Sequence, residues 1–239
     1  MNIYTPLEGT IGLSWVIQAS LLAGFLVVVG GYLIRWRLAQ AGGGVVPDEG
    51  ASLRNIVEVI VEMLANLAQD RIGPEWRKYF PIVGTMFFFI LVANLMGLLP
   101  GVGGATADAN TTWAWAIIAW LVYTAVGIAK HKHKYIVKFM GPSFFEREMF
   151  GRKVHFRLLM PIFLVLELPL DLARILTLAV RLLANMFADH TVIGVWLTLV
   201  PIGVPAIFMG LGLIIAFLQA FIFALLTMIY IGLALDEPH

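Results

Sequence analysis

The sequence has no cysteine, which excludes disulfide bonds and thiolate metal sites. Charge is also scarce: Asp, Glu, Lys and Arg make up 13% of the chain and hydrophobic residues 60%, whereas soluble domains carry roughly 25% charged residues. None of those four charged residue types occurs in residues 9–34, 79–107, 109–129 and 190–235. Because a membrane span needs about 20 apolar residues, the sequence predicts an all-α, polytopic membrane protein.

We expect about five hydrophobic segments and one surface amphipathic helix within a single membrane domain covering residues 1–239. Pro201 and Pro205 divide the last apolar stretch, so residues 158–239 should form a long helical hairpin. The predicted parts are a first span (1–40), an amphipathic interfacial helix (51–72), a two-span hairpin (76–130), a basic cytoplasmic loop (131–157) and a final helical hairpin (158–239).

Lys and Arg are missing from residues 1–34, 79–129 and 190–239, and most of them lie in residues 54–78 and 130–157. The positive-inside rule places those basic segments in the cytoplasm, with the N-terminus outside and the C-terminus inside. The first ten residues lack the basic region of a cleaved signal peptide, so the first span should be permanent.

Residues 51–72 repeat apolar side chains at helical spacing and are interrupted on the other side by Arg54, Glu58, Glu62 and Asp70. Two interpretations are open for this helix. It lies along the membrane surface, or it packs as an ordinary amphipathic helix on the rest of the protein.

A polar stripe runs along the helix predicted for residues 158–194. At about 100° per residue, six side chains fall within a sector roughly 80° wide on an otherwise apolar helix. They are Glu167, Asp171, Arg174, Arg181, Asn185 and Asp189. His190 lies off this stripe, at roughly 140° from Glu167.

The two arginines of the stripe differ in their neighbours. Arg174 follows Asp171 at i,i+3, so either mutual neutralisation or a functional role is open for it. Arg181 has no carboxylate within one turn of its own helix. Because its guanidinium cannot lose its charge, we expect Arg181 to meet an anion or a water-filled path supplied from elsewhere.

The helix predicted for residues 206–235 contains one amide, Gln219, with Tyr230 close to the same face. Arg181, Asn185 or water would satisfy Gln219, and a purely structural hydrogen bond is equally open. Asn94 in the second span either lines a wet cavity or packs between helices.

Other chemistries lack their signatures. His131 and His133 do not share a helical face, so no metal site is expected, and no cofactor motif, phosphate-binding loop or nucleophile elbow occurs. We expect neither nucleotide nor nucleic-acid binding, and no catalytic site of an enzyme within this chain itself.

The segments "LAVRLLANMFADH", "FLQAFIFALLTMIYI" and "ILVANLMGLLP" resemble subunit a of the F-type ATP synthase over roughly residues 75–235. The resemblance implies a stator subunit of a rotary motor in the bacterial inner membrane, with a ring of c subunits, peripheral-stalk b subunits and the rest of the complex as partners. It also implies that the last two helices wrap against the ring in a tilted hairpin.

By this resemblance, Arg181 is the ion-translocation arginine that faces the carboxylate of each passing c subunit and blocks direct proton flow. Two aqueous half-channels would then deliver and remove protons. We expect Glu167, Asp171 and Arg174 along the inner one, and Asn185, Asp189, His190, Gln219 and Asn94 along the outer one. Tyr230 is added to the proton pathway because it shares the Gln219 face.

The sequence departs from this family at the outer channel. Similar bacterial members often carry a carboxylate at the position of His190 and a histidine at that of Gly212, and some have an acid at that of Gly97. Here the acid is at Asp189 and the imidazole at His190. The rival hypotheses are a secondary transporter that binds an anionic substrate at Arg181, for which paired repeats and broken helices are lacking, and a structural scaffold.

Overall fold

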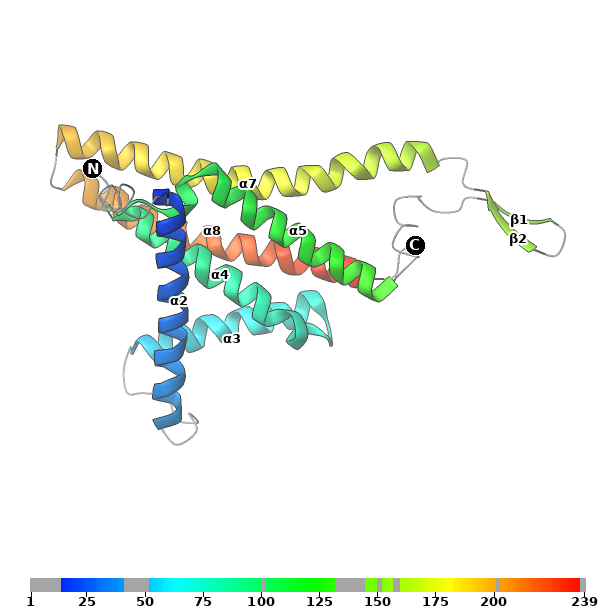
Figure 1. Cartoon of the computed structure of the whole chain (residues 1–239), viewed down its shortest axis with the longest axis horizontal. Helices are drawn as coiled ribbons and strands as arrows, with labels where there is room; N and C mark the ends of the chain where they lie inside the picture. The colour runs from blue at the N-terminus through cyan, green and yellow to red at the C-terminus, as the bar shows by residue number, and fades with distance from the viewer. Residues whose placement is uncertain are drawn as a thin grey trace.

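The computed structural model describes residues 14–40, 52–99, 102–131, 145–149, 152–156, 160–200 and 203–236. The description does not include the two chain ends. It also leaves out the side chains of residues 37–40, 53, 145–149, 152–156 and 160–168. The long elements are helices α2 (Trp15–Gln40), α3 (Leu53–Ile72), α4 (Trp76–Leu98), α5 (Ala109–His131), α7 (Met160–Leu199) and α8 (Val204–Leu235). The predicted all-α polytopic fold is confirmed (Figure 1).

Four of these helices, α2, α4, α5 and α8, are long and apolar enough to cross a membrane. Helix α7, whose sequence carries the charged stripe, is not among the four found within the described residues. With 40 residues, α7 rises about 60 Å, twice the ~30 Å of hydrocarbon in a bilayer. A helix of that length fits within a membrane only when it is strongly inclined.

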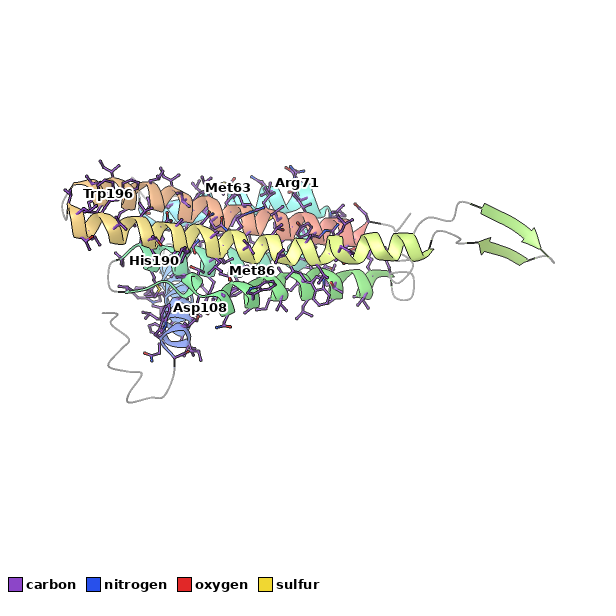
Figure 2. All side chains as sticks on the ribbon, turned by 90° about the horizontal axis from the view of Figure 1, so that it is seen from above. Met63, Arg71, Met86, Asp108, His190 and Trp196 are labelled. Atoms are coloured by element: carbon purple, nitrogen blue, oxygen red, sulfur yellow. The ribbon has the colours of Figure 1, made fainter. Side chains whose placement is uncertain are left out.

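Helices α7 and α8 form the predicted hairpin and lie side by side along the molecule (Figures 1 and 2). The predicted break is confirmed: Gly203, with φ of +93°, precedes α8, and Pro205 stands in its first turn, where a missing N–H costs nothing. Helix α7 continues to Leu199, beyond the predicted end at residue 194, because Gly194 is tolerated within it.

The first span, α2, runs across the direction of the hairpin in Figure 1 and is seen nearly end-on in Figure 2. It contacts α4 and keeps most of its surface exposed, including Leu21, Phe25 and Val28. Exposed apolar side chains of this kind suit a lipid environment. If α2 follows the membrane normal, α7 and α8 cross the bilayer at a steep tilt.

Helix α3 begins at Ser52, whose hydroxyl accepts a 3.3 Å hydrogen bond from the backbone N–H of Asn55, and it ends at Gly73, whose φ is +80°. It packs on α4 and α8, with Leu64 and Ala68 buried. Ile56 and Val59 at its start remain exposed. This geometry favours the interpretation that the amphipathic helix packs on the rest of the protein. Its apolar edge at Ile56 and Val59 stays exposed.

The main core lies where α4, α5, α7 and α8 meet. Helix α4 contacts α8 most extensively, and the rings of Phe87 and Phe217 meet edge to face with centroids 5.9 Å apart. Small buried residues such as Ala116, Ala220 and Ala224 let the backbones approach closely. This core fixes the relative rotation of α7 and α8, and so decides which polar side chains face each other.

Two short elements were not predicted. A 3-10 turn, η1 (Ala105–Ala107), lies between α4 and α5. An antiparallel hairpin of β1 (Phe145–Met149) and β2 (Arg152–Phe156) lies within the predicted basic loop and projects beyond the helices (Figure 1). Most of the remaining loop lies outside the described residues.

Candidate functional site

The candidate site is the polar stripe of α7 together with the side chains of α8 that face it. Five stripe residues have described side chains, from Asp171 to Asp189. Glu167 is part of α7, but its side chain lies outside the description. The five divide into an inner pair, a central arginine and an outer group.

The inner pair is Asp171 and Arg174. The Arg174 Nη1 donates a 2.9 Å hydrogen bond to Asp171 Oδ1, and the guanidinium lies 5.2 Å from the centroid of the Tyr230 ring on α8. The Tyr230 ring in turn lies 5.5 Å from that of Tyr123, which is buried on α5. Arg174 is therefore paired with a carboxylate of its own helix and contacts the Tyr230 ring of α8, which Tyr123 of α5 supports.

Sequence reasoning did not single out Tyr123. Nothing in the sequence marks it, because its role depends on how α5 is rotated against α8. Its side chain is 2% exposed and backs the ring that stacks on Arg174.

Between the inner pair and the outer group stands Arg181, which is half-buried at the edge of the exposed face of α7. Leu178 and Leu182 on neighbouring turns are buried in the core. Among the described residues, Arg181 has no hydrogen-bond or ion-pair partner. Among the residues that the structure describes, it is a permanent cation without a partner anion.

Asn185, one turn beyond Arg181, joins the two helices of the hairpin. Its Nδ2 donates a 2.7 Å hydrogen bond to Oε1 of Gln219, which is buried on α8. Arg181, Asn185 and water were the partners expected for Gln219 from the sequence. In the structure the partner is Asn185.

The outer group contains Asp189 and His190, both half-buried. A β-carbon added at Gly212 would lie 3.7 Å from Asp189 Oδ2, and one added at Gly97 would lie 3.2 Å from His190 Nε2. The four positions where the sequence departs from its resembled family therefore meet at one place. Within the described part of the chain, the buried His190 Nε2 has no hydrogen-bond partner.

Asn94 lies in this region of α4 and is completely buried. Its Oδ1 accepts a 2.7 Å hydrogen bond from the Thr106 hydroxyl of η1, and its Nδ2 reaches the Ala216 carbonyl of α8 at 3.5 Å. This geometry favours the packing interpretation of Asn94. Thr106 was missed from the sequence because it stands in a glycine-rich loop whose path could not be predicted.

In the described ranges, no group of three His, Asp or Glu side chains is placed to hold a metal ion. The described side chains of the site form a polar path along the hairpin that is interrupted at Arg181. Paired groups stand at its two ends, and one uncompensated cation stands between them.

The chain matches the family model described as the ATP synthase A chain over residues 17–232. It is 36% identical over 238 residues to an ATP synthase subunit a of Bdellovibrio bacteriovorus, covering 99% of this chain and 98% of that relative. A similar protein of Syntrophotalea carbinolica, ATP synthase subunit a 1, is 38% identical over 207 residues, covering 87% and 80%. That of Geobacter sulfurreducens is 37% identical over 187 residues, covering 78% and 76%.

Proposed function

This chain belongs to the ATP synthase A chain family, and on that premise we propose that it carries protons between two half-channels and a ring of carboxylates, with Arg181 separating the two. The membership itself makes it a multi-pass membrane protein of the stator of a rotary ATP synthase. The observation that carries the finer proposal is the half-buried Arg181 without an anion among the described residues.

Arg181 needs a partner that moves. An uncompensated guanidinium in an apolar region is costly, and a carboxylate brought opposite it by another subunit removes that cost. The cation favours the ionised form of this carboxylic acid, so the acid releases its proton when it arrives. The carboxylate then pairs with Arg181 until it moves on and takes up another proton.

The surface beside Arg181 suits a passing helix. Thr177, Ala184 and Ala188 are exposed neighbours of Arg181 on α7, and all three are small. Small side chains let another helix approach closely in a membrane. The partner on this face is the c-subunit ring, and we assign peripheral-stalk b subunits to another face of the chain.

The two half-channels lie on opposite sides of Arg181. Asp171 is ten residues before it and Asp189 eight residues after it, which along a helix are about 15 Å and 12 Å. Neither separation can be bridged by one hydrogen bond, and the fixed positive charge of Arg181 disfavours an excess proton in any water chain beside it. Each half-channel needs its own access to water.

We assign Glu167, Asp171, Arg174 and Tyr230 to the inner route, and Asn185, Asp189, His190 and Gln219 to the outer route. Asn94, whose amide is bonded to Thr106 and Ala216, packs beside the outer route. The two ring nitrogens of an imidazole can accept and donate a proton, which makes His190 suitable for proton relay. The outer route opens on the side of the N-terminus and the inner route toward the cytoplasm, in the inner membrane of a bacterium.

Disulfide cross-linking tests where the ring docks, because the chain has no cysteine of its own. Ala184→Cys should form a disulfide with a cysteine placed beside the carboxylate of a c subunit in the assembled complex. Val28→Cys on α2, 70% exposed, is the matched control and should not. Equal yields from both positions, or none from Ala184→Cys in an assembled complex, would contradict the proposal.

A further inference from the structure

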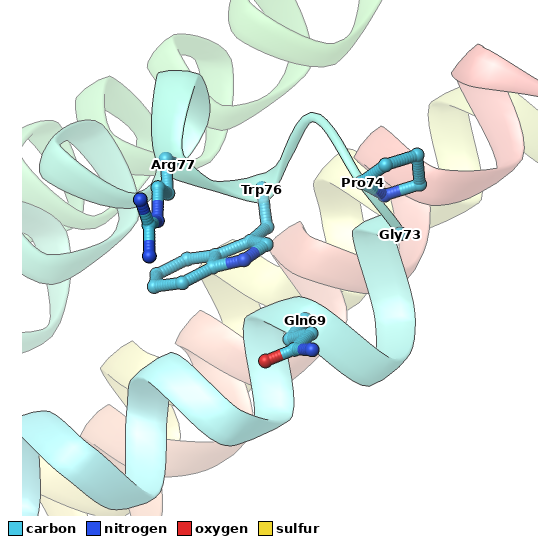
Figure 3. Close-up of a pocket in the computed structure, with 5 residues that line it drawn as sticks. All are labelled: Gln69, Gly73, Pro74, Trp76 and Arg77. Carbon is cyan, nitrogen blue, oxygen red and sulfur yellow. The ribbon is translucent and has the colours of Figure 1, made fainter.

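A second polar surface lies far from the stripe, at the turn that joins α3 to α4. A cleft of about 570 Å³ opens there, lined by Gln69, Gly73, Pro74, Trp76 and Arg77. Figure 3 shows the Trp76 ring above Gln69, with the Arg77 guanidinium beside the ring. The guanidinium lies 5.6 Å from the ring centroid. Trp76 thus holds an exposed cation at the edge of a cleft.

The balance of charge at this cleft is positive. Arg77 has no carboxylate partner among the described residues. The nearby Glu75 is engaged elsewhere, because Lys130 Nζ on α5 donates a 2.6 Å hydrogen bond to its Oε1. Asp70 lines a separate cavity together with Phe221 of α8. An anion in the cleft would therefore meet Arg77 without a competing carboxylate.

The cleft also lies at one end of a membrane-spanning segment. Trp76 is the first residue of α4, one of the four helices suited to cross a bilayer. Its ring meets that of Phe80 edge to face at 5.6 Å, and Lys78 lies 5.4 Å from the centroid of the Tyr79 ring. Trp and Tyr rings with adjacent basic residues are typical of the level of the lipid headgroups.

We propose that this cleft binds the phosphate of an anionic phospholipid headgroup, with Arg77 as its main contact and Gln69 and the Trp76 indole N–H as further donors. A guanidinium presents a fork of N–H groups that matches phosphate oxygens. The acyl chains would extend beside α4 into the bilayer, where Ile82 is exposed one turn beyond Lys78. This inference depends on the membrane placement of α4 and not on the proton pathway.

The test uses the whole complex in vesicles that contain a photoactivatable phosphatidylglycerol. Light should attach the probe to a peptide that contains residues 69–77. Arg77→Gln should reduce this labelling ~10-fold, the loss expected for a charge-assisted hydrogen bond. Arg77→Lys, which keeps the charge, should retain more of it. Arg35→Gln, which removes an exposed arginine at the end of α2, should leave the labelling unchanged.

Competition identifies the ligand. Unlabelled phosphatidylglycerol should displace the probe, whereas phosphatidylcholine and ~10 mM inorganic phosphate should not. Displacement by inorganic phosphate would assign the cleft to a soluble anion and overturn the lipid proposal. Equal competition by phosphatidylcholine, or unchanged labelling in Arg77→Gln, would each overturn it as well.

Discussion

The side-chain amide of Asn185 donates a 2.7 Å hydrogen bond to the side-chain carbonyl of Gln219, and this bond links the two helices of the hairpin beside Arg181. Arg181 stands one turn from Asn185 and has no such partner among the described residues. Beside Arg181 the two helices are thus linked by neutral groups, while the cation of Arg181 stays available.

Exchanging the two amide residues tests how much the hydrogen bond between Asn185 and Gln219 contributes to function. Asn185→Ala leaves the buried Gln219 carbonyl unpaired, and we expect ATP-driven proton pumping to fall about fivefold, for a bond worth ~1 kcal/mol. Asn185→Gln combined with Gln219→Asn restores a donor and an acceptor and should recover part of the pumping. If the double variant pumps no better than Asn185→Ala, the bond is not what positions the hairpin.

The Asp171–Arg174 pair predicts an asymmetry between single and double variants. Arg174→Gln leaves a buried carboxylate without its cation, which should destabilise the complex by about 1–3 kcal/mol after allowance for the 25% exposure of the arginine side chain. Asp171→Asn with Arg174→Gln removes both charges and should cost less. Thermal dissociation of the complex measures both, with Tyr230→Phe as the control that keeps the ring. Equal losses in the single and double variants would mean that the pair contributes nothing.

Gly232 on α8 predicts a steric limit on how α3 can pack. A β-carbon at Gly232 would overlap the backbone carbonyl oxygen of Arg71, whereas one at Gly210 would meet nothing within 4 Å. We expect Gly232→Ala to separate α3 from α8 and lower the yield of assembled complex several-fold, since backbone cannot move aside as a side chain can. Gly210→Ala should assemble normally. Normal assembly of Gly232→Ala would show that the contact is not tight.

The Glu75–Lys130 contact predicts a small dependence of stability on pH. The hydrogen bond and charge of Lys130 hold the pKa of the Glu75 carboxyl below its ordinary value of 4.5. A carboxyl with a lowered folded-state pKa stabilises the fold above that ordinary value, and the contribution is lost as the pH falls through the folded-state pKa. We therefore expect Glu75→Gln to reduce the loss of stability on acidification, measured as the thermal dissociation temperature of the complex against pH. An unchanged loss would mean that the exposed contact has no net effect.

Much of the fold could be predicted from composition and helical periodicity. The uncharged stretches corresponded to α2, α4, α5 and α8, and the two prolines marked the turn before α8 because their effect on the backbone is local. The β1–β2 hairpin and the continuation of α7 to Leu199 were missed. The hairpin is short and charged, which gives its strands little apolar pattern to recognise.

The stripe on α7 could be predicted because it depends only on spacing along one helix, and Asp171 with Arg174 is such a pair. Contacts between helices could not be predicted in the same way. The stacking of Tyr230 on Arg174 and the hydrogen bond from Thr106 to Asn94 depend on the rotation of each helix, which packing in the core decides. The meeting of Gly97, Asp189, His190 and Gly212 depends on it too.

The most direct test of the role of Arg181 compares native vesicles with vesicles carrying Arg181→Ala in the whole complex. ATP-driven proton pumping is measured first, and passive proton leak is measured after the soluble sector is removed. We predict that pumping is lost while the complex assembles, and that the leak persists or rises because nothing separates the half-channels. Pumping that survives Arg181→Ala would contradict the central claim and make Arg181 a structural residue.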